Sequence, residues 1–348
     1  GAQFVFAPIV GSLSDAYGRK PVLLAALAFL ALDYVIMALA GTFWMLLLGR
    51  TLAGLAGATY ITATAYISDI TTKSERAARF GMIGAAFGLG FILGPALGGV
   101  AAAWHITAPF WLAAVLALAN VAFGIFVLPE SLKQERRRPF GLRDLNPFGA
   151  IVRSFRLPGL AIPLVAIFIF EFANMAYVTI WAFWGREAFG WSTLVIGLSL
   201  SAYGVLVTIA QAGVMPVAVR VLGERRLVLW GMLVALVAFT GFGFANAVWA
   251  VAVLLPLAAL SDLVPPTLTA MAANAGDEDK QGLIQGVIAS LASIAAILGP
   301  LVYTPLFRVF VAPDALIYLP GAPFLLGAVM VAALIPLAVR YRPNAQDV

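Results

Sequence analysis

Two segments of this chain recur later in the sequence, and both recur at an offset of 205 residues. The charged turn GSLSDAYGRKP, at residues 11–21, aligns with PVAVRVLGERR at residues 216–226. The apolar run GMIGAAFGLGFILGP, at residues 81–95, aligns with GVIASLASIAAILGP at residues 286–300. Two landmarks at one offset indicate a duplicated unit. In membrane proteins, internal repeats of this kind are typical of secondary transporters.

The composition places this duplicated unit in a membrane. Hydrophobic residues make up 63% of the 348 residues and charged residues 11%, with a mean hydropathy of +1.00. A soluble domain carries about 25% charged residues, so this chain cannot cover a soluble surface of its size. The sequence has no cysteine and one histidine, His105, which excludes disulfides and histidine-rich or thiolate metal sites. We expect a polytopic membrane protein with no metal and no cofactor.

Apolar segments of the length needed to cross a bilayer, roughly 20 residues, occur throughout the chain. The predicted spans are residues 1–16, 21–40, 43–68, 78–101, 107–128, 161–184, 193–216, 226–246, 248–272, 281–307 and 316–340. Under the repeat, the span at 161–184 has no partner, so we expect that the first of 12 helices is missing before residue 1. The predicted fold is therefore all-α with two pseudo-symmetric helix bundles. The predicted domains are an N-terminal bundle at 1–129, a cytoplasmic linker at 130–160, a C-terminal bundle at 161–342 and a polar tail at 343–348.

The basic residues set the orientation of these spans. All of the 21 lysines and arginines except Arg50, Arg186 and Arg308 fall on one set of loops and the tail. That side is predicted to be cytoplasmic, because cytoplasmic loops carry an excess of Lys and Arg. The same bias accounts for most of the net charge of +5, so the charge does not indicate a nucleic-acid partner.

The first copy of the repeated turn combines glycines with charged groups. Its predicted latch residues, together with an acid at the end of the 43–68 span, are Gly11, Asp15, Gly18, Arg19, Lys20 and Asp69. The glycines permit close approach of helix ends, and Asp15 can accept hydrogen bonds at the N-terminus of a neighbouring helix. Arg19 and Lys20 can pair with acids such as Asp69, although a plain interfacial acid is an equal alternative for Asp69. Such a latch would hold one conformation of a rocking protein.

This turn resembles the loop signature between helices 2 and 3 of the major facilitator superfamily. GRTLAGLAGA at 49–58 resembles the fourth-helix motif of that family, and GLGFILGPALGG at 88–99 resembles a fifth-helix motif associated with proton-coupled antiporters. Shorter strings are similar to the tetracycline/proton antiporter branch: QFVFAP at 3–8, ALDYVIMA at 31–38, AYISDIT at 65–71 and QGLIQG at 281–286. The resemblance covers nearly the whole chain and implies a bacterial inner-membrane transporter.

The fifth-helix motif has two compatible interpretations. Its residues are Gly90, Gly94, Pro95, Gly98 and Gly99. Small residues allow close helix packing, and a glycine followed by a proline kinks a helix. We expect a kinked, tightly packed helix that seals the substrate path.

Asp33 and Arg50 are charged residues within predicted spans, and both lie in the outer half of a ~30 Å slab. Their spans form a hairpin, so we expect an Asp33–Arg50 pair. One interpretation is a fixed structural ion pair; the other is a proton site in which protonation of Asp33 frees Arg50 and shifts a conformational equilibrium. The resembled branch implies an acid and an arginine at these positions, both needed for transport.

Two further acids lie inside predicted spans of the second half. Glu171 lies near the middle of the 161–184 span beside Phe170 and Asn174, where the resembled branch carries an amide. Asp262 precedes two prolines, which break the helical hydrogen-bond ladder. Each acid is predicted to take part in proton coupling, with a purely structural carboxyl as the alternative.

The predicted substrate-lining residues in this half are Phe170, Asn174 and Gln211, with helix packing as the alternative for Gln211. The resembled branch also carries an aspartate in its ninth helix, and the corresponding stretch at 231–245 has no acid. Glu171 or Asp262 then replaces it, or the substrate is another compound.

These features predict a monomeric, proton-coupled antiporter that exports a small amphiphilic drug across the lipid bilayer by alternating access. The alternative is a symporter or facilitator for a small metabolite, against which the fifth-helix motif argues. An integral membrane enzyme is not expected, because the sequence has no nucleophile elbow, phosphate loop or metal-spaced acids.

Overall fold

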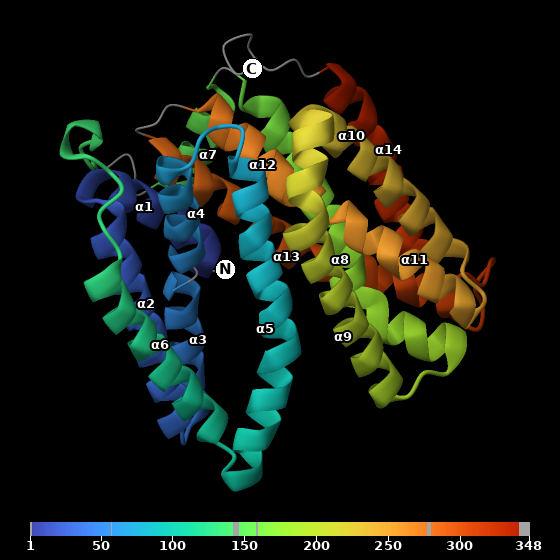
Figure 1. Ribbon diagram of the computed structural model, residues 1–348. Helices are drawn as coiled ribbons and strands as arrows, with labels where there is room; N and C mark the ends of the chain where they lie inside the picture. The colour runs from blue at the N-terminus through green and yellow to red at the C-terminus, as the bar shows by residue number, and fades with distance from the viewer. Residues whose placement is uncertain (1, 57, 142–145, 158, 277–279, 341–348) are drawn as a thin grey trace. The chain divides into compact units, whose positions relative to one another are not determined.

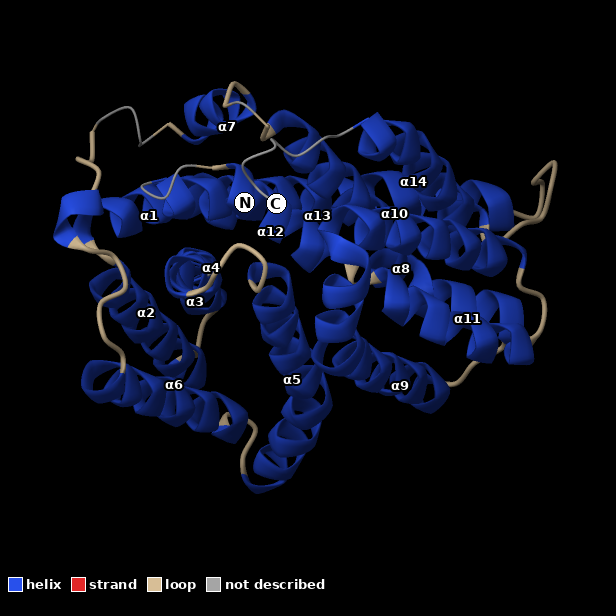
Figure 2. Cartoon of the chain, turned by 45° about the horizontal axis from the view of Figure 1, so that its top comes forward, coloured by secondary structure: helices blue, strands red, loops and turns tan. Residues whose placement is uncertain are grey.

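The computed structural model of the chain describes residues 2–56, 58–141, 146–157, 159–276 and 280–340 (Figure 1). These residues form helices joined by loops, as Figure 2 shows, which confirms the predicted all-α class. Among them, eight helical stretches are long and apolar enough to cross a membrane. The chain is therefore a multi-pass membrane protein.

The helices follow the predicted spans closely. In the first half they are α1 (Ala2–Tyr17), α2 (Arg19–Leu39), α3 (Phe43–Ala56), α4 (Ala58–Ile70), α5 (Arg76–Trp104) and α6 (Ala108–Val127). The connection contains η1 (Gln134–Arg136) and α7 (Pro147–Phe155). In the second half they are α8 (Ala161–Phe189), α9 (Thr193–Ile209), the π-helical η3 (Ala210–Val214), α10 (Met215–Phe244), α11 (Val248–Ser261), α12 (Val264–Ala275), α13 (Gln281–Val311) and α14 (Ala322–Arg340).

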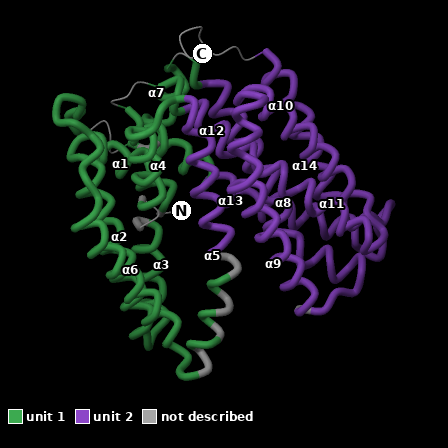
Figure 3. The backbone as a smooth tube through the Cα atoms, viewed as in Figure 1, with its two compact units in different colours: residues 1–73, 93–160, 273–293 green, residues 74–92, 161–272, 294–348 purple. Residues whose placement is uncertain are grey.

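Contacts divide the chain into two compact units (Figure 3). Unit 1 comprises Gly1–Lys73, Leu93–Leu160 and Ala273–Ser293, and unit 2 comprises Ser74–Ile92, Ala161–Ala272 and Ile294–Val348. Each unit is mostly one half of the sequence plus the beginning of one helix from the other half. The helices that cross over in this way are α5 and α13, which the repeat aligns with each other. The predicted bundles at 1–129 and 161–342 are defined by the sequence repeat, whereas the two units are defined by contacts. The predicted bundle boundaries therefore stay a prediction.

In unit 1, α2 packs against α6, α3 and α4, and α1 packs against α2, α3 and α4. The beginning of α13 is held against α1. Ala7, Ile61 and Ala289 form one buried apolar cluster, and the Ser290 hydroxyl donates a hydrogen bond to the Phe4 carbonyl at 3.0 Å. A Cβ on Gly11 would fall on the backbone of α13, so the glycine predicted to permit close approach does so here.

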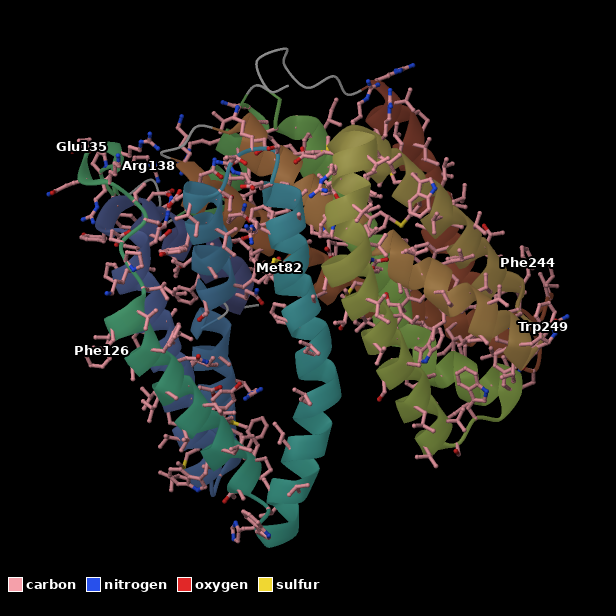
Figure 4. All side chains as sticks on the ribbon, in the orientation of Figure 1. Met82, Phe126, Glu135, Arg138, Phe244 and Trp249 are labelled. Atoms are coloured by element: carbon pink, nitrogen blue, oxygen red, sulfur yellow. The ribbon has the colours of Figure 1, made fainter. Side chains whose placement is uncertain are left out.

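In unit 2, α10 packs against α14 and α11, α14 packs against α8, and α11 packs against α9. Large apolar side chains also cover the outer surface of the helices. Figure 4 shows Phe126 on α6 of unit 1 and Trp249 on α11 of unit 2, which are 86% and 72% exposed. An apolar outer surface of this kind suits a hydrocarbon layer, where water is absent.

The aligned glycines of the repeated turn have nearly the same backbone conformation. Gly18 has φ +105° and ψ 158°, and Gly223 has φ +74° and ψ 161°. This region of backbone space is essentially restricted to glycine. Gly18 directly precedes α2, and Gly223 interrupts α10 with a non-helical residue. The turn that reveals the repeat in the sequence is therefore also a repeated backbone structure.

Replacing these glycines by alanine should destabilise the protein unequally. Both Gly18→Ala and Gly223→Ala pay about 1–3 kcal/mol for the backbone conformation. In Gly18→Ala the new Cβ would also lie 2.5 Å from Glu130 Oε2, whereas at Gly223 no described atom lies within 4 Å. We expect a clearly lower midpoint of thermal unfolding in detergent for Gly18→Ala than for Gly223→Ala. Equal midpoints would show that the crowding at Gly18 has no energetic consequence.

Candidate functional site

The charged turn forms a buried ionic cluster in unit 1, centred on Arg19. The Arg19 side chain has no exposed surface. Its guanidinium binds Asp15 of α1 through Nη1 at 2.5 Å and Asp69 of α4 through Nε at 2.8 Å. Nη1 also donates to the Ser14 hydroxyl at 2.7 Å. A planar fork of donors suits this double pairing, which ties the ends of α1, α2 and α4 together.

Asp15 extends this cluster to the second half of the sequence. Its Oδ1 accepts a hydrogen bond from the Gly282 N–H at 2.7 Å, and its Oδ2 accepts one from the Leu283 N–H at 2.9 Å. Both donors belong to the first turn of α13, where N–H groups have no partner within the helix and the helix dipole favours an anion. The hydrogen-bonding role expected for Asp15 is thus directed at α13.

Glu130, which no sequence motif singles out, completes the cluster. Its Oε1 accepts from the N–H of Arg19 at 2.8 Å, and its Oε2 accepts from the N–H of Lys20 at 3.2 Å. Gly18, the N-cap of α2, has no side chain that could do this. The sequence predicts that the Lys20 side chain can pair with an acid, whereas its Nζ donates to the Ile125 carbonyl at 2.9 Å. The only signal for Glu130 in the sequence is an acid shortly after the predicted span at 107–128.

Asp33 and Arg50 form the expected ion pair, also in unit 1. Asp33 is buried, and its Oδ2 lies 3.4 Å from Arg50 Nη2, while the Arg50 side chain is 56% exposed. The second carboxylate oxygen, Oδ1, is buried without a hydrogen-bond partner. A Cβ on Gly49 would lie 2.8 Å from that oxygen, so glycine at this position makes room for the carboxylate between α2 and α3. The pair is long and leaves one oxygen able to take a proton.

A second polar group lies within unit 2, around Asp262. The Tyr203 hydroxyl of α9 donates to Asp262 Oδ2 at 2.5 Å, and the Gln211 amide donates to the Asp262 carbonyl at 3.0 Å. Glu171 of α8 interacts electrostatically with Asp262. Asn174 Oδ1 is buried without a partner. The structure thus joins Gln211 to Asp262 by a hydrogen bond, places Glu171 within electrostatic reach of Asp262, and adds Tyr203.

The break that carries Asp262 differs slightly from the expected one. α11 ends at Ser261 and α12 begins at Val264, so the chain leaves the helix before the prolines. Pro265 and Pro266 lie in the first turn of α12, where a missing N–H costs nothing. The carbonyl released from the helical ladder is that of Asp262, and Gln211 satisfies it from the π-helical turn η3.

Close packing along α5 occurs before the residues predicted for it. A Cβ on Gly81, Gly84 or Gly88 would overlap Met215, Gln211 or Thr208 of unit 2. By contrast, a Cβ on any of three motif glycines would meet no described atom within 4 Å; these are Gly90, Gly94 and Gly98. The surroundings of Pro95 and Gly99 lie outside the part of the chain that the structure describes. The close contacts of α5 follow from the helical spacing of the earlier glycines, which face α9 and η3.

Phe170 is the one predicted lining residue with no exposed surface. Its ring packs in the core of unit 2 in this conformation, so contact with a substrate would need another conformation.

Among the described residues no group of three or more His, Cys, Asp or Glu could hold a metal ion.

The sequence profile of the Major Facilitator Superfamily matches residues 1–300 and, in an overlapping second match, residues 165–347. The chain belongs to the Major Facilitator Superfamily. This assignment confirms the predicted family and fold, and its relatives are transport proteins rather than enzymes, as the sequence also predicted.

Among curated relatives of this superfamily member, tetracycline resistance protein class C of Escherichia coli is 39% identical over 305 residues, covering 88% of this chain and 77% of the relative. The class G protein of Vibrio anguillarum is 39% identical over 309 residues, with the same coverage. The resemblance to the tetracycline-resistance branch is therefore confirmed.

Solved structures agree with this assignment. The crystal structure of a human organic anion transporter, TETRAN, has a TM-score of 0.84 at 26% identity and covers 97% of this chain and 81% of its own. The Escherichia coli fucose:proton symporter has a TM-score of 0.76 at 16% identity, with 98% and 88% coverage, and so shows the fold alone.

Proposed function

We propose that this Major Facilitator Superfamily transporter is a proton-coupled antiporter that exports a small amphiphilic drug of the tetracycline type. Drug efflux is supported by the identity of 39% to two tetracycline resistance proteins over most of the chain. Both of these relatives are bacterial, so the expected location is a bacterial inner membrane. We expect the protein to work there as a monomer.

The observation that carries proton coupling is the state of Asp33. A buried carboxylate that has only one distant ion-pair partner and one unpartnered oxygen is poorly stabilised as an anion. A proton on the free oxygen removes that cost and releases Arg50. Binding of a proton therefore changes the local electrostatic balance, as a coupling site requires.

The latch supports the alternating-access part of the proposal. In unit 1, Asp15 fastens α1 to the first turn of α13, which belongs to the other half of the repeat. In unit 2, the glycines at the start of α5 pack on η3, again across the repeat. Both contacts can form only when the two repeats meet at these ends. Proton and drug would act by favouring states in which these contacts are made or broken.

A whole-cell efflux experiment separates this function from the alternative of a symporter or facilitator. Cells that express the protein are loaded with tetracycline, and its fluorescence is followed during export. We expect export against a concentration gradient that stops within the response time of an added protonophore, since the proton gradient drives it. Continued export after collapse of the gradient, or uptake in place of export, would contradict the proposal.

A further inference from the structure

We propose that the polar cluster of unit 2 binds the protonated amine of the exported compound, which makes organic ammonium ions the preferred substrate class. The cluster consists of Glu171, Asn174, Tyr177, Tyr203, Gln211 and Asp262. The inference rests on the proposed drug export, since it names the chemical group by which the transported compound is recognised.

The two carboxylates of the cluster differ in their hydrogen bonds. Asp262 is fixed, because Tyr203 donates to its Oδ2 at 2.5 Å and Gln211 donates to its carbonyl at 3.0 Å. Glu171 has no hydrogen-bond or ion-pair partner among the residues that the structure describes, and the charge of Asp262 acts on it. It is neither fully buried nor fully exposed. Of the two acids, Glu171 is the one left for a ligand.

Among the described residues, no positive charge balances Glu171 and Asp262. No lysine or arginine of the described part of the chain forms an ion pair or a resolved electrostatic interaction with Glu171 or Asp262. Two neighbouring carboxyls in a membrane-embedded bundle are costly without a cation. A proton can balance one of them and a substrate cation the other.

Three buried oxygen atoms of the cluster lack hydrogen-bond partners. Gln211 is only 7% exposed, and its Oε1 has no hydrogen-bond partner while its amide N–H is used by Asp262. Asn174 Oδ1 and the Tyr177 hydroxyl are also buried without partners. Unsatisfied acceptors are normally avoided in protein interiors. A ligand that brings several N–H donors would satisfy such a group.

Aromatic rings fix the position of Tyr177 in the cluster. Tyr177 stacks on Phe239 with ring centroids 4.7 Å apart, and Phe242 and Phe324 lie edge-on or tilted against it at 5.6 and 5.4 Å. The three phenylalanines have no exposed surface, so they hold the Tyr177 ring in place rather than meet a ligand themselves. A divalent metal ion is less suitable, because among the described residues no third acid, histidine or cysteine joins the two carboxyls.

The test compares two probes that differ at a single amine, which is charged in one and acetylated and neutral in the other. Dansylcadaverine carries a primary ammonium group, and its N-acetyl derivative is neutral. Binding of each to the purified protein in detergent is measured by dansyl fluorescence, without any proton gradient. We expect the ammonium probe to bind at least about tenfold more tightly, in keeping with a charge-assisted hydrogen bond. We expect Glu171→Gln to remove this preference.

The matched control is Glu187→Gln, which alters an exposed acid of the same helix, α8, whose carboxylate accepts from the Tyr318 hydroxyl at 2.8 Å. It should keep the full preference for the ammonium probe. Equal binding of the two probes to the wild-type protein, or an unchanged preference in Glu171→Gln, would overturn the inference.

A second measurement uses the wild-type protein alone, in case the variant fails to fold. A hydrophobic carbodiimide should modify Glu171, detected by mass spectrometry of peptides. The N,N-dimethyl derivative of dansylcadaverine keeps the ammonium charge but cannot form a stable amide with the activated carboxyl, so it should protect Glu171, while the neutral acetylated probe should not. Equal modification with both probes would overturn the inference.

The two proposals can fail separately. A protein that shows the ammonium preference but exports nothing would contradict only the proposed function. A protein that exports tetracycline without the preference would contradict only this inference.

Discussion

Asp33→Asn should abolish proton-driven drug export while leaving the amount of folded protein unchanged. Asparagine has nearly the shape of aspartic acid, so it fits beside Gly49, but it carries no exchangeable charge to pair with Arg50. The coupling equilibrium would stay fixed in the state that belongs to the protonated acid. We expect the initial rate of tetracycline export from energised cells to fall at least tenfold, about 1.4 kcal/mol of lost coupling.

The control for this variant is Asp314→Asn, which changes an exposed acid in the connection between α13 and α14. It should export at the wild-type rate. Expression and the size-exclusion profile in detergent report folding for both variants. Export by Asp33→Asn at the wild-type rate under a proton gradient would leave Asp33 with a purely structural role.

Arg19→Met should be the most destabilising substitution in the latch. Methionine fills the space of the arginine stem, but it leaves Asp15 and Asp69 without the guanidinium that lies between them. Removing one partner from a buried ion pair costs about 3–5 kcal/mol. Arg19→Lys should recover only part of the loss, because a single ammonium lacks the fork that reaches both acids.

The measurement is thermal unfolding of the purified variants in detergent, with Lys20→Met as the neighbouring control. The Lys20 side chain donates to the Ile125 carbonyl and is partly exposed, and the backbone N–H that donates to Glu130 is kept in the variant, so the substitution should cost no more than about 0.5 kcal/mol. The ionic cluster would have no role in stability if Arg19→Met and Lys20→Met unfolded at the same temperature.

The features that the sequence predicts well are those set by local chemistry. Gly18 and Gly223 mark the repeated turn in the sequence, and both occupy backbone conformations that only glycine tolerates. The spans follow from the length of apolar runs, and the family follows from motifs of consecutive residues. Asp33 and Arg50 could be paired from sequence because they lie on the two arms of one hairpin.

The features that the sequence did not reveal depend on packing between distant segments. Glu130 caps α2 from 111 residues away, and Tyr203 reaches Asp262 across 59 residues. Neither pairing has a fixed spacing that a motif could record. The same reason explains the shift in α5, since the glycines that touch a neighbour are selected by how α9 and η3 lie against that helix.

Proton movement in reconstituted vesicles would reveal directly whether drug and protons are exchanged through Asp33. The wild-type protein is placed in liposomes that contain a pH-sensitive dye, and a tetracycline gradient is imposed with equal pH on both sides. We expect drug moving down its gradient to drive protons in the opposite direction, and we expect Asp33→Asn to show no such proton movement. Drug movement by the wild-type protein without a pH change, or with protons moving in the same direction as the drug, would contradict it.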